Sequence, residues 1–274
     1  MTIALIDGDV LCYAACKARV QAANPDTQFV SLDDNGKREV VEYTQAENRK
    51  YLEECWENFN KELEKMLDAI FCDDYMLAVK GDGNYRDDLY PEYKANRNNA
   101  DPARRNTFVP LIRKLAVAED LAIPADGREA DDMVRIWAEE CRAAGIDYVI
   151  CTIDKDLKCI PGKHWHMKSR VLFTVSEEQA LRHYYEQLLK GDPTDNIPGV
   201  PRVGEVKAAK LLADFSTEEE YQEVVIDQYI KAYDDDWRSF LLSNGKMIHL
   251  QRDLNDSFTL RNWPLALELE QELA

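Results

Sequence analysis

Three short apolar segments that each end in acidic residues constrain the fold of this chain most strongly. They are "IALIDGD" (residues 3–9), "YMLAVKGD" (75–82) and "YVICTIDKD" (148–156), and helical patterns separate them. Strands that alternate with helices form a twisted, mostly parallel sheet flanked by helices, so we predict an α/β fold. The ligand crevice of such a sheet lies at the carboxyl ends of its strands, where Asp7, Asp82, Asp154 and Asp156 are expected.

Capping residues and apolar spacing predict the elements between the first two strands. Residues 28–43 are expected to form a hairpin with its turn at Asn35-Gly36. A long amphipathic helix is expected next, opened by a capping box of Thr44 and Glu47. Its apolar residues recur at helical spacing as far as Ile70, which indicates a face packed in the core.

The second half of the chain is expected to be mainly helical. One helix is predicted at about 108–120, a second ends at Gly145, and a third begins at the N-cap Ser176. The acidic tail after residue 216 is also expected to be helical. We predict an α/β core over 1–175 and a helical region over 176–274, packed as one unit.

The segment "GREADDMV" (127–134) places three carboxylates where a helix begins. Acids are favourable there because the helix dipole is positive at its N-terminus. Asp126 is predicted as the N-cap and Glu129 as its capping-box partner, with the Glu129 head group bordering the core. A structural reason therefore exists for these acids, but the strand-end acids suggest a second one.

Composition limits the class of protein. The net charge is −18, yet residues 80–114 carry 8 basic against 5 acidic residues, and residues 155–210 carry 10 against 7. Contacts with nucleic acid are expected in these two segments. The seven cysteines include no CxxC pair, which favours reduced thiols in the cytoplasm and argues against a structural zinc site. No run is apolar enough for a membrane span, so no membrane partner is expected.

Nine acidic residues from the strand ends, the helix start and "GDPTDNIPGV" are expected to meet in one crevice. Two like charges 4 Å apart repel by about 4 kcal/mol at an effective dielectric of 20, so such a cluster needs cations. Oxygen ligands without His or Cys select Mg²⁺, with Mn²⁺ as a substitute, and two such ions suit phosphodiester hydrolysis. The predicted metal ligands are Asp7, Asp82, Glu129, Asp131, Asp132, Asp154, Asp156, Asp192 and Asp195.

Five motifs in a shared order carry a resemblance to a known family. They are "LIDGD", "GDGNYRDDLYPEYKANR", "READDM", "TIDKDLKCIP" and "GDPTDNIPGVPRVG", within residues 1–212. In these motifs the chain resembles the flap endonuclease / 5′–3′ exonuclease family, and most of all its small stand-alone bacteriophage members. Two departures are the short spacing between Asp82 and Arg86 and the absence of an arginine from "VLCYAAC".

The resemblance implies a PIN-like 5′-nuclease fold with an arch at about 84–107 and a helix–three-turn–helix module at about 185–213. Asp7, Asp82, Glu129, Asp131 and Asp132 match the ligands of the first metal ion. The remaining four acids, Asp195 less closely than the others, match those of the second. The implied activity is two-metal hydrolysis that leaves a 5′-phosphate and a 3′-hydroxyl.

Basic and aromatic residues alternate in "YRDDLYPEYKANR", a pattern typical of a solvated turn but also of single-strand binding. The resemblance makes this segment a gateway for a 5′ end. It implies that Tyr93 stacks on a base and that Lys94 and Arg97 neutralise the scissile phosphate, and we group Arg86 with these catalytic cations.

The segment "NIPGVPRVGEVKAAKLL" is either a plain loop between helices or a phosphate-binding turn. The resemblance implies the second, with sequence-independent binding of duplex phosphates around a K⁺ ion. Its predicted DNA-binding residues are Gly199, Val200, Gly204, Lys207 and Lys210.

The expected function is a structure-selective 5′–3′ exonuclease or flap endonuclease of DNA replication or repair. Its expected partners are duplex DNA with a 5′ flap, a 5′ end or an RNA primer, and replication proteins. One alternative is a PIN-type single-strand ribonuclease, against which the duplex-binding loop implied by "DNIPGVPRVG" argues. The other is a non-catalytic junction-binding protein, against which the complete set of acids argues.

Overall fold

The computed structural model describes residues 1–16, 20–24, 28–32, 38–42, 45–95 and 108–272. Contacts between them define two compact units. The first unit comprises Met1–Asp82, Asn99–Ile153 and Lys163–Phe173, and the second comprises Gly83–Asn98, Asp154–Gly162 and Thr174–Ala274. The chain enters the second unit for the last time close to the predicted boundary at residue 175. Packing of both parts as one unit stays a prediction.

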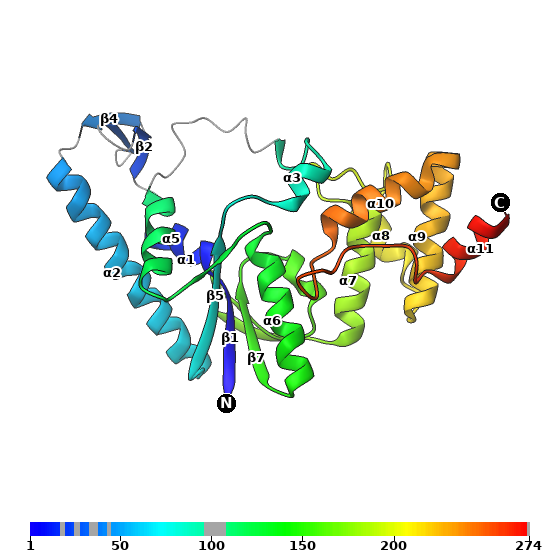
Figure 1. Cartoon of the computed structure of the whole chain (residues 1–274), viewed down its shortest axis with the longest axis horizontal. Helices are drawn as coiled ribbons and strands as arrows, with labels where there is room; N and C mark the ends of the chain where they lie inside the picture. Colours follow the sequence, from blue (N-terminus) through cyan, green and yellow to red (C-terminus); the bar gives the residue numbers. More distant parts are fainter. Residues whose placement is uncertain (17–19, 25–27, 33–37, 43–44, 96–107, 273–274) are drawn as a thin grey trace. The chain divides into compact units, whose positions relative to one another are not determined.

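A six-stranded sheet forms the centre of the first unit, with the strand order β6-β5-β1-β7-β8-β9 (Figure 1). Pairing is parallel between β1 and β5, β1 and β7, β5 and β6, and β7 and β8, which confirms the predicted mostly parallel α/β sheet. The strands are β1 (Thr2–Asp7), β5 (Asp74–Lys80), β6 (Ile123–Ala125), β7 (Asp147–Thr152), β8 (Gly162–His166) and β9 (Val171–Val175).

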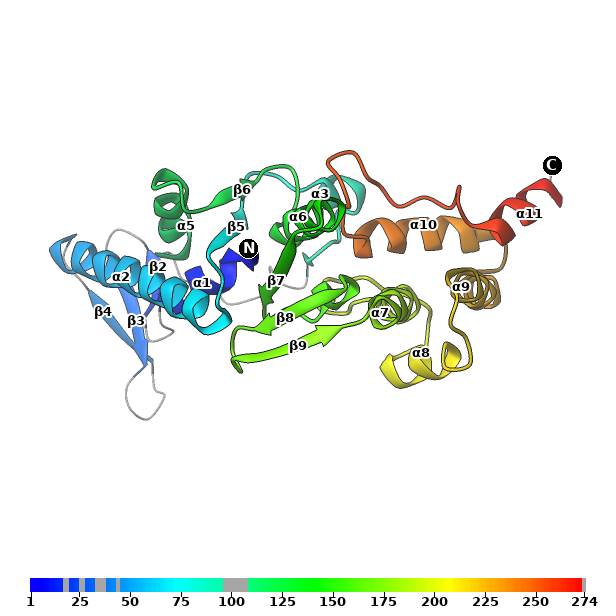
Figure 2. The ribbon, with the colours of Figure 1, turned by 90° about the horizontal axis from the view of Figure 1, so that it is seen from below.

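Helices cover both faces of this sheet (Figure 2). Helix α6 (Ala130–Ala144) packs on β1, β5 and β7 from one side. Helices α1 (Gly8–Ala15), α2 (Gln45–Ile70) and α5 (Phe108–Ala118) gather on the other, where the stripe of α2 enters the core as predicted. Buried Phe59 and Met66 represent this stripe, and burying such side chains stabilises the unit by about 1.5–3 kcal/mol each.

A separate three-stranded antiparallel sheet contains β2 (Val20–Asn24), β3 (Gln28–Leu32) and β4 (Arg38–Glu42). The pairing of β3 with β4 confirms the predicted hairpin. Its Asn35-Gly36 turn and the predicted helix cap Thr44 lie outside the described residues.

The second unit is helical, with α7 next to α8, α9 and α10 in its core (Figure 1). Ser176 and Gln179 form the predicted capping box of α7. The tail is less continuous than predicted, because a non-helical stretch over 249–263 separates its last two helices. The elements are α3 (Tyr85–Leu89), η2 (Asp156–Cys159), α7 (Glu177–Lys190), α8 (Glu205–Leu211), α9 (Glu218–Tyr233), η3 (Asp234–Asp236), α10 (Trp237–Ile248) and α11 (Pro264–Glu272).

Polar groups inside the second unit are bonded to one another. The Tyr229 hydroxyl donates to the Leu188 carbonyl at 2.8 Å and accepts a hydrogen bond from Asn244 Nδ2 at 2.8 Å. Packing also requires a glycine at position 245, because a Cβ there would lie 2.1 Å from the Phe258 ring.

Among the described residues, no helix has the length and apolar character needed to cross a membrane.

Candidate active site

Asp7 ends the central strand β1, and its carboxylate is almost fully buried. The neighbouring strand β7 runs parallel to β1, with Ile6 beside Cys151, so Thr152 reaches the end of β1. Its hydroxyl donates to Asp7 Oδ2 at 3.1 Å. The parallel sheet therefore holds Asp7 in one orientation at the carboxyl edge.

Asp82 follows β5 and is hydrogen-bonded to the two residues that come after the neighbouring strand β6. Its backbone N–H donates to Asp126 Oδ1 at 2.9 Å, and its carbonyl accepts from the Gly127 N–H at 2.8 Å. Gly81 is required here, because a Cβ would lie 2.3 Å from Asp126 Oδ1. The side chain of Asp82 is exposed, two residues beyond the strand.

The start of α6 differs from the prediction in its register. Glu129, not Asp126, is the N-cap residue, and its backbone N–H donates to Asp132 Oδ2 at 3.1 Å. Asp126 instead accepts the Asp82 N–H, because Gly127, at φ 73°, turns the chain before the helix begins. Asp132 is fully buried, whereas Glu129 and Asp131 are half-buried.

Asp9 and Arg113 form an ion pair that the sequence motifs did not predict. Arg113 Nε lies 2.7 Å from Asp9 Oδ1, and Nη2 lies 2.9 Å from Oδ2. The Lys80 N–H also donates to Asp9 Oδ1 at 3.2 Å. Asp9 is thus neutralised by a side chain of α5, whereas Asp7 accepts the Thr152 hydroxyl. A lone arginine in the apolar run "FVPLIRKLAV" was the sequence signal for this contact.

Three acids of the second unit form a cluster at η2 and the loop after α7. The Asp156 N–H donates to Asp154 Oδ1 at 2.8 Å, and Gln187 Nε2 donates to Asp156 Oδ1 at 2.8 Å. The Thr194 N–H donates to Asp192 Oδ1 at 2.7 Å. These hydrogen bonds orient the three carboxylates. Asp154 lies just before η2, Asp156 begins it, and Asp192 lies in the loop after α7.

The electrostatics of this cluster favour a cation. Burial, followed by the charges of Asp154 and Asp192, raises the pKa of Asp156 to about 7. Burial alone would raise the pKa of Asp192, but the Thr194 N–H, the Lys155 charge and the hydrogen bond with Asp156 together lower it. The neighbouring carboxylates thus oppose the ionisation of Asp156, and a hard divalent ion bound by these oxygens would relieve that repulsion. The residues present therefore fit such an ion.

Asp195 contacts the gateway segment. Its Oδ2 accepts from the Tyr93 hydroxyl at 3.4 Å and lies 3.6 Å from Lys94 Nζ, and its carbonyl accepts the Lys94 N–H at 3.0 Å. Lys94 Nζ also lies 4.8 Å from the centre of the Tyr93 ring. Tyr93 itself is only 6% exposed and belongs to the core of the second unit, which corrects its predicted role as an open stacking surface for a base.

Arg86 is also placed differently from the prediction. Its side chain is 1% exposed, and it donates from Nε to the Met247 carbonyl at 2.9 Å and from Nη2 to the His249 carbonyl at 2.8 Å. These carbonyls lie at the C-terminus of α10, where a cation is favourable. Arg86 is therefore a structural residue and not a catalytic cation. Arg97 lies outside the described residues.

Two of the three glycines in the loop between α7 and α8 have different requirements. Gly199 has φ 61°, and a Cβ there would lie 2.3 Å from the Gly191 nitrogen, so the fold itself requires it. Gly204, the N-cap of α8, has φ −98° and open space around it. Val200 is buried and its N–H donates to the Leu189 carbonyl at 2.8 Å, so its side chain supports the loop from within. Lys207 and Lys210 are exposed on α8.

Within the described residues, no three Asp, Glu, His or Cys side chains are already arranged as a metal-binding group. The nine predicted ligands divide between the units, with Asp7, Asp82, Glu129, Asp131 and Asp132 in the first and the other four in the second. They remain candidate ligands.

Comparison with known sequences decides the family. The family model described as "5′-3′ exonuclease, N-terminal resolvase-like domain" matches residues 2–186. The chain belongs to this family. The resemblance predicted from the five motifs is thereby confirmed.

Curated relatives of this 5′–3′ exonuclease family member differ in length. This chain is 33% identical over 196 residues to DNA polymerase I of Rhizobium leguminosarum, a match that covers 68% of this chain and 19% of the polymerase. It is 29% identical over 194 residues to a 5′–3′ exonuclease of Buchnera aphidicola, covering 66% of this chain and 64% of the relative. The chain thus spans about a fifth of the polymerase.

Solved structures of bacteriophage T5 proteins share the fold. The T5 D15 flap endonuclease (D155K), in a complex with DNA and metal ions, has a TM-score of 0.56 and 13% identity, covering 90% of this chain and 99% of the other. The T5 5′-exonuclease with bound zinc has the same TM-score and identity, with coverage of 91% and 100%. This similarity confirms the predicted fold class.

Proposed function

We propose that the protein is a structure-selective, divalent-metal-dependent nuclease that hydrolyses DNA, and RNA primers on DNA, from a 5′ end or flap. Membership of the 5′–3′ exonuclease family supports the reaction class. The observation that carries the proposal is the half-buried carboxyl pair of Asp156 and Asp192 beside Asp154, where the pKa of Asp156 is raised by burial and by the neighbouring acids.

The proposed ligands are the acids of both units. Asp7, Asp82, Glu129, Asp131 and Asp132 would hold one Mg²⁺ or Mn²⁺ ion, and Asp154, Asp156, Asp192 and Asp195 a second. When bound, paired divalent ions activate water and neutralise charge at the phosphate. Thr152 and Gln187 keep Asp7 and Asp156 in position through the hydrogen bonds described above.

Lys94 is the proposed cation for the scissile phosphate, with Arg97 as its partner. Lys94 belongs to the gateway segment, and its partly exposed side chain lies beside Asp195. A cation held next to a carboxylate is positioned in advance, so little reorganisation is needed when a phosphate arrives. Duplex DNA would contact Gly204, Lys207 and Lys210, and K⁺ is proposed at the same loop.

The proposed substrates are duplexes with a 5′ flap, a free 5′ end or an RNA primer, in DNA replication or repair. The T5 flap endonuclease structure with DNA supports a DNA partner for this fold. We further propose the cytoplasm as the compartment, because all seven cysteines are free thiols.

Product mapping tests the proposal. Flap, nicked and RNA-primed duplexes are incubated with Mg²⁺, with Ca²⁺, or with EDTA, and products are sized with their end groups. We expect 5′-phosphate and 3′-hydroxyl products with Mg²⁺ only, and duplex binding without cleavage with Ca²⁺. Asp131→Ala is expected to abolish cleavage while duplex binding stays within a few-fold.

Other outcomes would favour the alternatives. Cleavage of single-stranded RNA alone would identify a PIN-type ribonuclease. Junction binding without cleavage under any divalent ion would identify a non-catalytic binding protein. Cleavage in EDTA would exclude the metal mechanism.

A further inference from the structure

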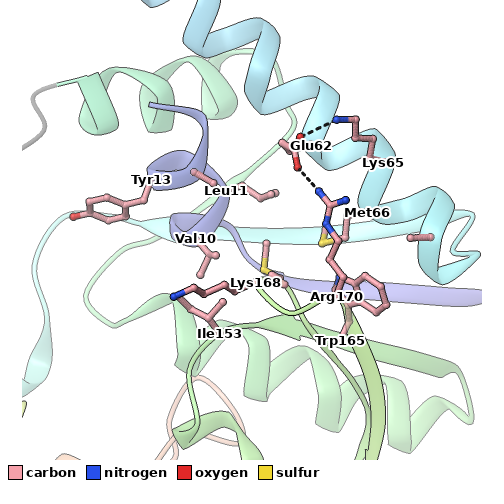
Figure 3. A pocket seen from close by; sticks show the side chains of 13 residues that line it. Val10, Leu11, Tyr13, Glu62, Lys65, Met66, Ile153, Trp165, Lys168 and Arg170 are labelled. Carbon is pink, nitrogen blue, oxygen red and sulfur yellow. Dashed lines mark hydrogen bonds and ion pairs between the residues drawn. The ribbon is translucent and has the colours of Figure 1, made fainter. Parts of the chain in front are cut away.

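A cavity of about 370 Å³ lies in the first unit (Figure 3). Side chains from α1, α2, β8, the β8–β9 turn and the residue after β7 line it, and none of the acids proposed as metal ligands is among them. Its volume is in the range of sites that bind small ligands or single large side chains.

The floor of the cavity is apolar. Leu11 and Met66 are buried, whereas Ile153 remains 47% exposed although it is a large aliphatic side chain. Apart from the Trp165 indole N–H, these side chains offer no good hydrogen-bond partner, so a polar group seated on them would lose most of its water without compensation. The floor consists mainly of Val10, Leu11, Met66, Ile153, Trp165 and Met167.

The charged side chains that line the cavity are mostly basic. Lys65, Lys168 and Arg170 line the cavity, and Glu62 is the acidic residue among the lining residues. Glu62 is already bonded to Lys65 at 3.0 Å and to Arg170 at 3.1 Å, as Figure 3 shows. In a chain with a net charge of −18, the rim is therefore locally basic.

We propose that this cavity docks a short acidic segment of a partner protein. One large apolar side chain of the segment would occupy the floor, and its carboxylates would meet Lys168, Lys65 and Arg170. Charge complementarity with the rim selects an acidic partner, and the apolar floor selects a side chain in preference to a nucleobase, whose polar edges it leaves unpaired. This inference is independent of the proposed nuclease activity.

The probe is a fluorescein-labelled, aspartate-rich peptide with one central phenylalanine, and binding to the full chain is measured by fluorescence anisotropy. A second peptide carries serine in place of the phenylalanine. We expect the phenylalanine peptide to bind at least about tenfold more tightly, because only it buries an apolar side chain.

Two variants separate the floor from the rim. Ala69→Trp, at an exposed position of α2 that lines the cavity, fills the floor and keeps every charge. Lys168→Glu reverses a charge at the exposed β8–β9 turn and keeps the floor. Each is expected to weaken binding of the phenylalanine peptide by about tenfold.

Lys163→Glu is the matched control, because Lys163 is an exposed residue of β8 outside the lining. It should change peptide affinity by less than about twofold. All three variants should keep the melting temperature and the cleavage rate of the parent chain without peptide.

Equal binding of the two peptides, or binding unchanged in both Ala69→Trp and Lys168→Glu, would overturn the proposal. So would a single-stranded oligonucleotide that displaces the peptide and loses affinity in the same two variants, since the cavity would then bind nucleic acid. Self-association of the chain that Lys168→Glu abolishes would assign the cavity to a second copy and also overturn it.

Discussion

Arg113 holds both carboxylate oxygens of Asp9, at 2.7 and 2.9 Å, and so separates the two acids of the "LIDGD" motif into different roles. Asp9 joins α1 to α5 through this ion pair. Asp7, two residues earlier, accepts the Thr152 hydroxyl at 3.1 Å and is a proposed metal ligand.

The first prediction follows from this division. Asp7→Asn should lower the single-turnover cleavage rate by about a hundredfold or more, since even outer partners of metal ligands are worth 10–100-fold. Asp9→Asn should instead lower the free energy of unfolding by about 2 kcal/mol, because it leaves the Arg113 guanidinium partly unpaired. Urea unfolding and single-turnover kinetics on both variants check this. An Asp9→Asn variant of parental stability would refute the structural role.

The second prediction contrasts Arg86 with Lys94. Arg86→Gln should lower the free energy of unfolding by about 3 kcal/mol, because two charge-assisted hydrogen bonds to the end of α10 are lost. Lys94→Ala should cost about 1 kcal/mol or less, since its ion pair is partly exposed. At saturating DNA, however, Lys94→Ala should slow single turnover. If the rate is unchanged, Lys94 is only a surface lysine.

The third prediction concerns Gly199 and Gly204 in the α7–α8 loop. Gly199→Ala should lower the free energy of unfolding by at least about 2 kcal/mol, because the added Cβ meets the Gly191 backbone at a positive φ. Gly204→Ala should leave stability within about 0.5 kcal/mol, since nothing lies within 4 Å of the new carbon.

Gly204→Ala should nevertheless weaken duplex binding, by about tenfold, if a phosphate approaches the backbone at this position. Anisotropy with a labelled duplex at fixed salt measures this, and thermal melting supplies the stability control. Parental duplex affinity in Gly204→Ala would argue against a phosphate contact at Gly204.

The fourth prediction concerns acid stability. Burial opposes ionisation of Asp256, but the hydrogen bond from His249, at 2.7 Å, and the Arg252 N–H lower its pKa to about 2, below the ordinary value of 3.8. The folded state therefore binds this proton less readily than the unfolded state. Its contribution to stability is present above about pH 4 and is lost as the pH falls towards about 2.

Asp256→Asn should accordingly destabilise the chain at pH 7 by about 1–2 kcal/mol, and the difference from the parent should shrink below pH 4. Urea unfolding across this pH range gives the comparison. Asp253→Asn, on an exposed residue of the same loop, is the control. A difference that stays constant down to pH 2 would exclude Asp256 as the titrating group.

The sequence by itself determined the α/β alternation, the order of the motifs and the places of the acids, because these depend on local periodicity and on turn residues next to each strand. It predicted β1, β5 and β7 but not the short strands β6, β8 and β9. Their sequences, such as "IPA" and "GKHWH", have little apolar alternation, so their pairing depends on the strands beside them.

Only the tertiary structure decided what each charged side chain contacts. Asp9 and Arg113 lie 104 positions apart in the chain, and Arg86 lies 161 positions from Met247, so no local pattern links either pair. The same holds for Tyr93, whose ring belongs to the core cluster that residues of α7, α9 and α10 form in the second unit. Spacing along a chain predicts which residue types gather at a sheet edge, whereas burial and long-range partners decide which of them stay free for chemistry.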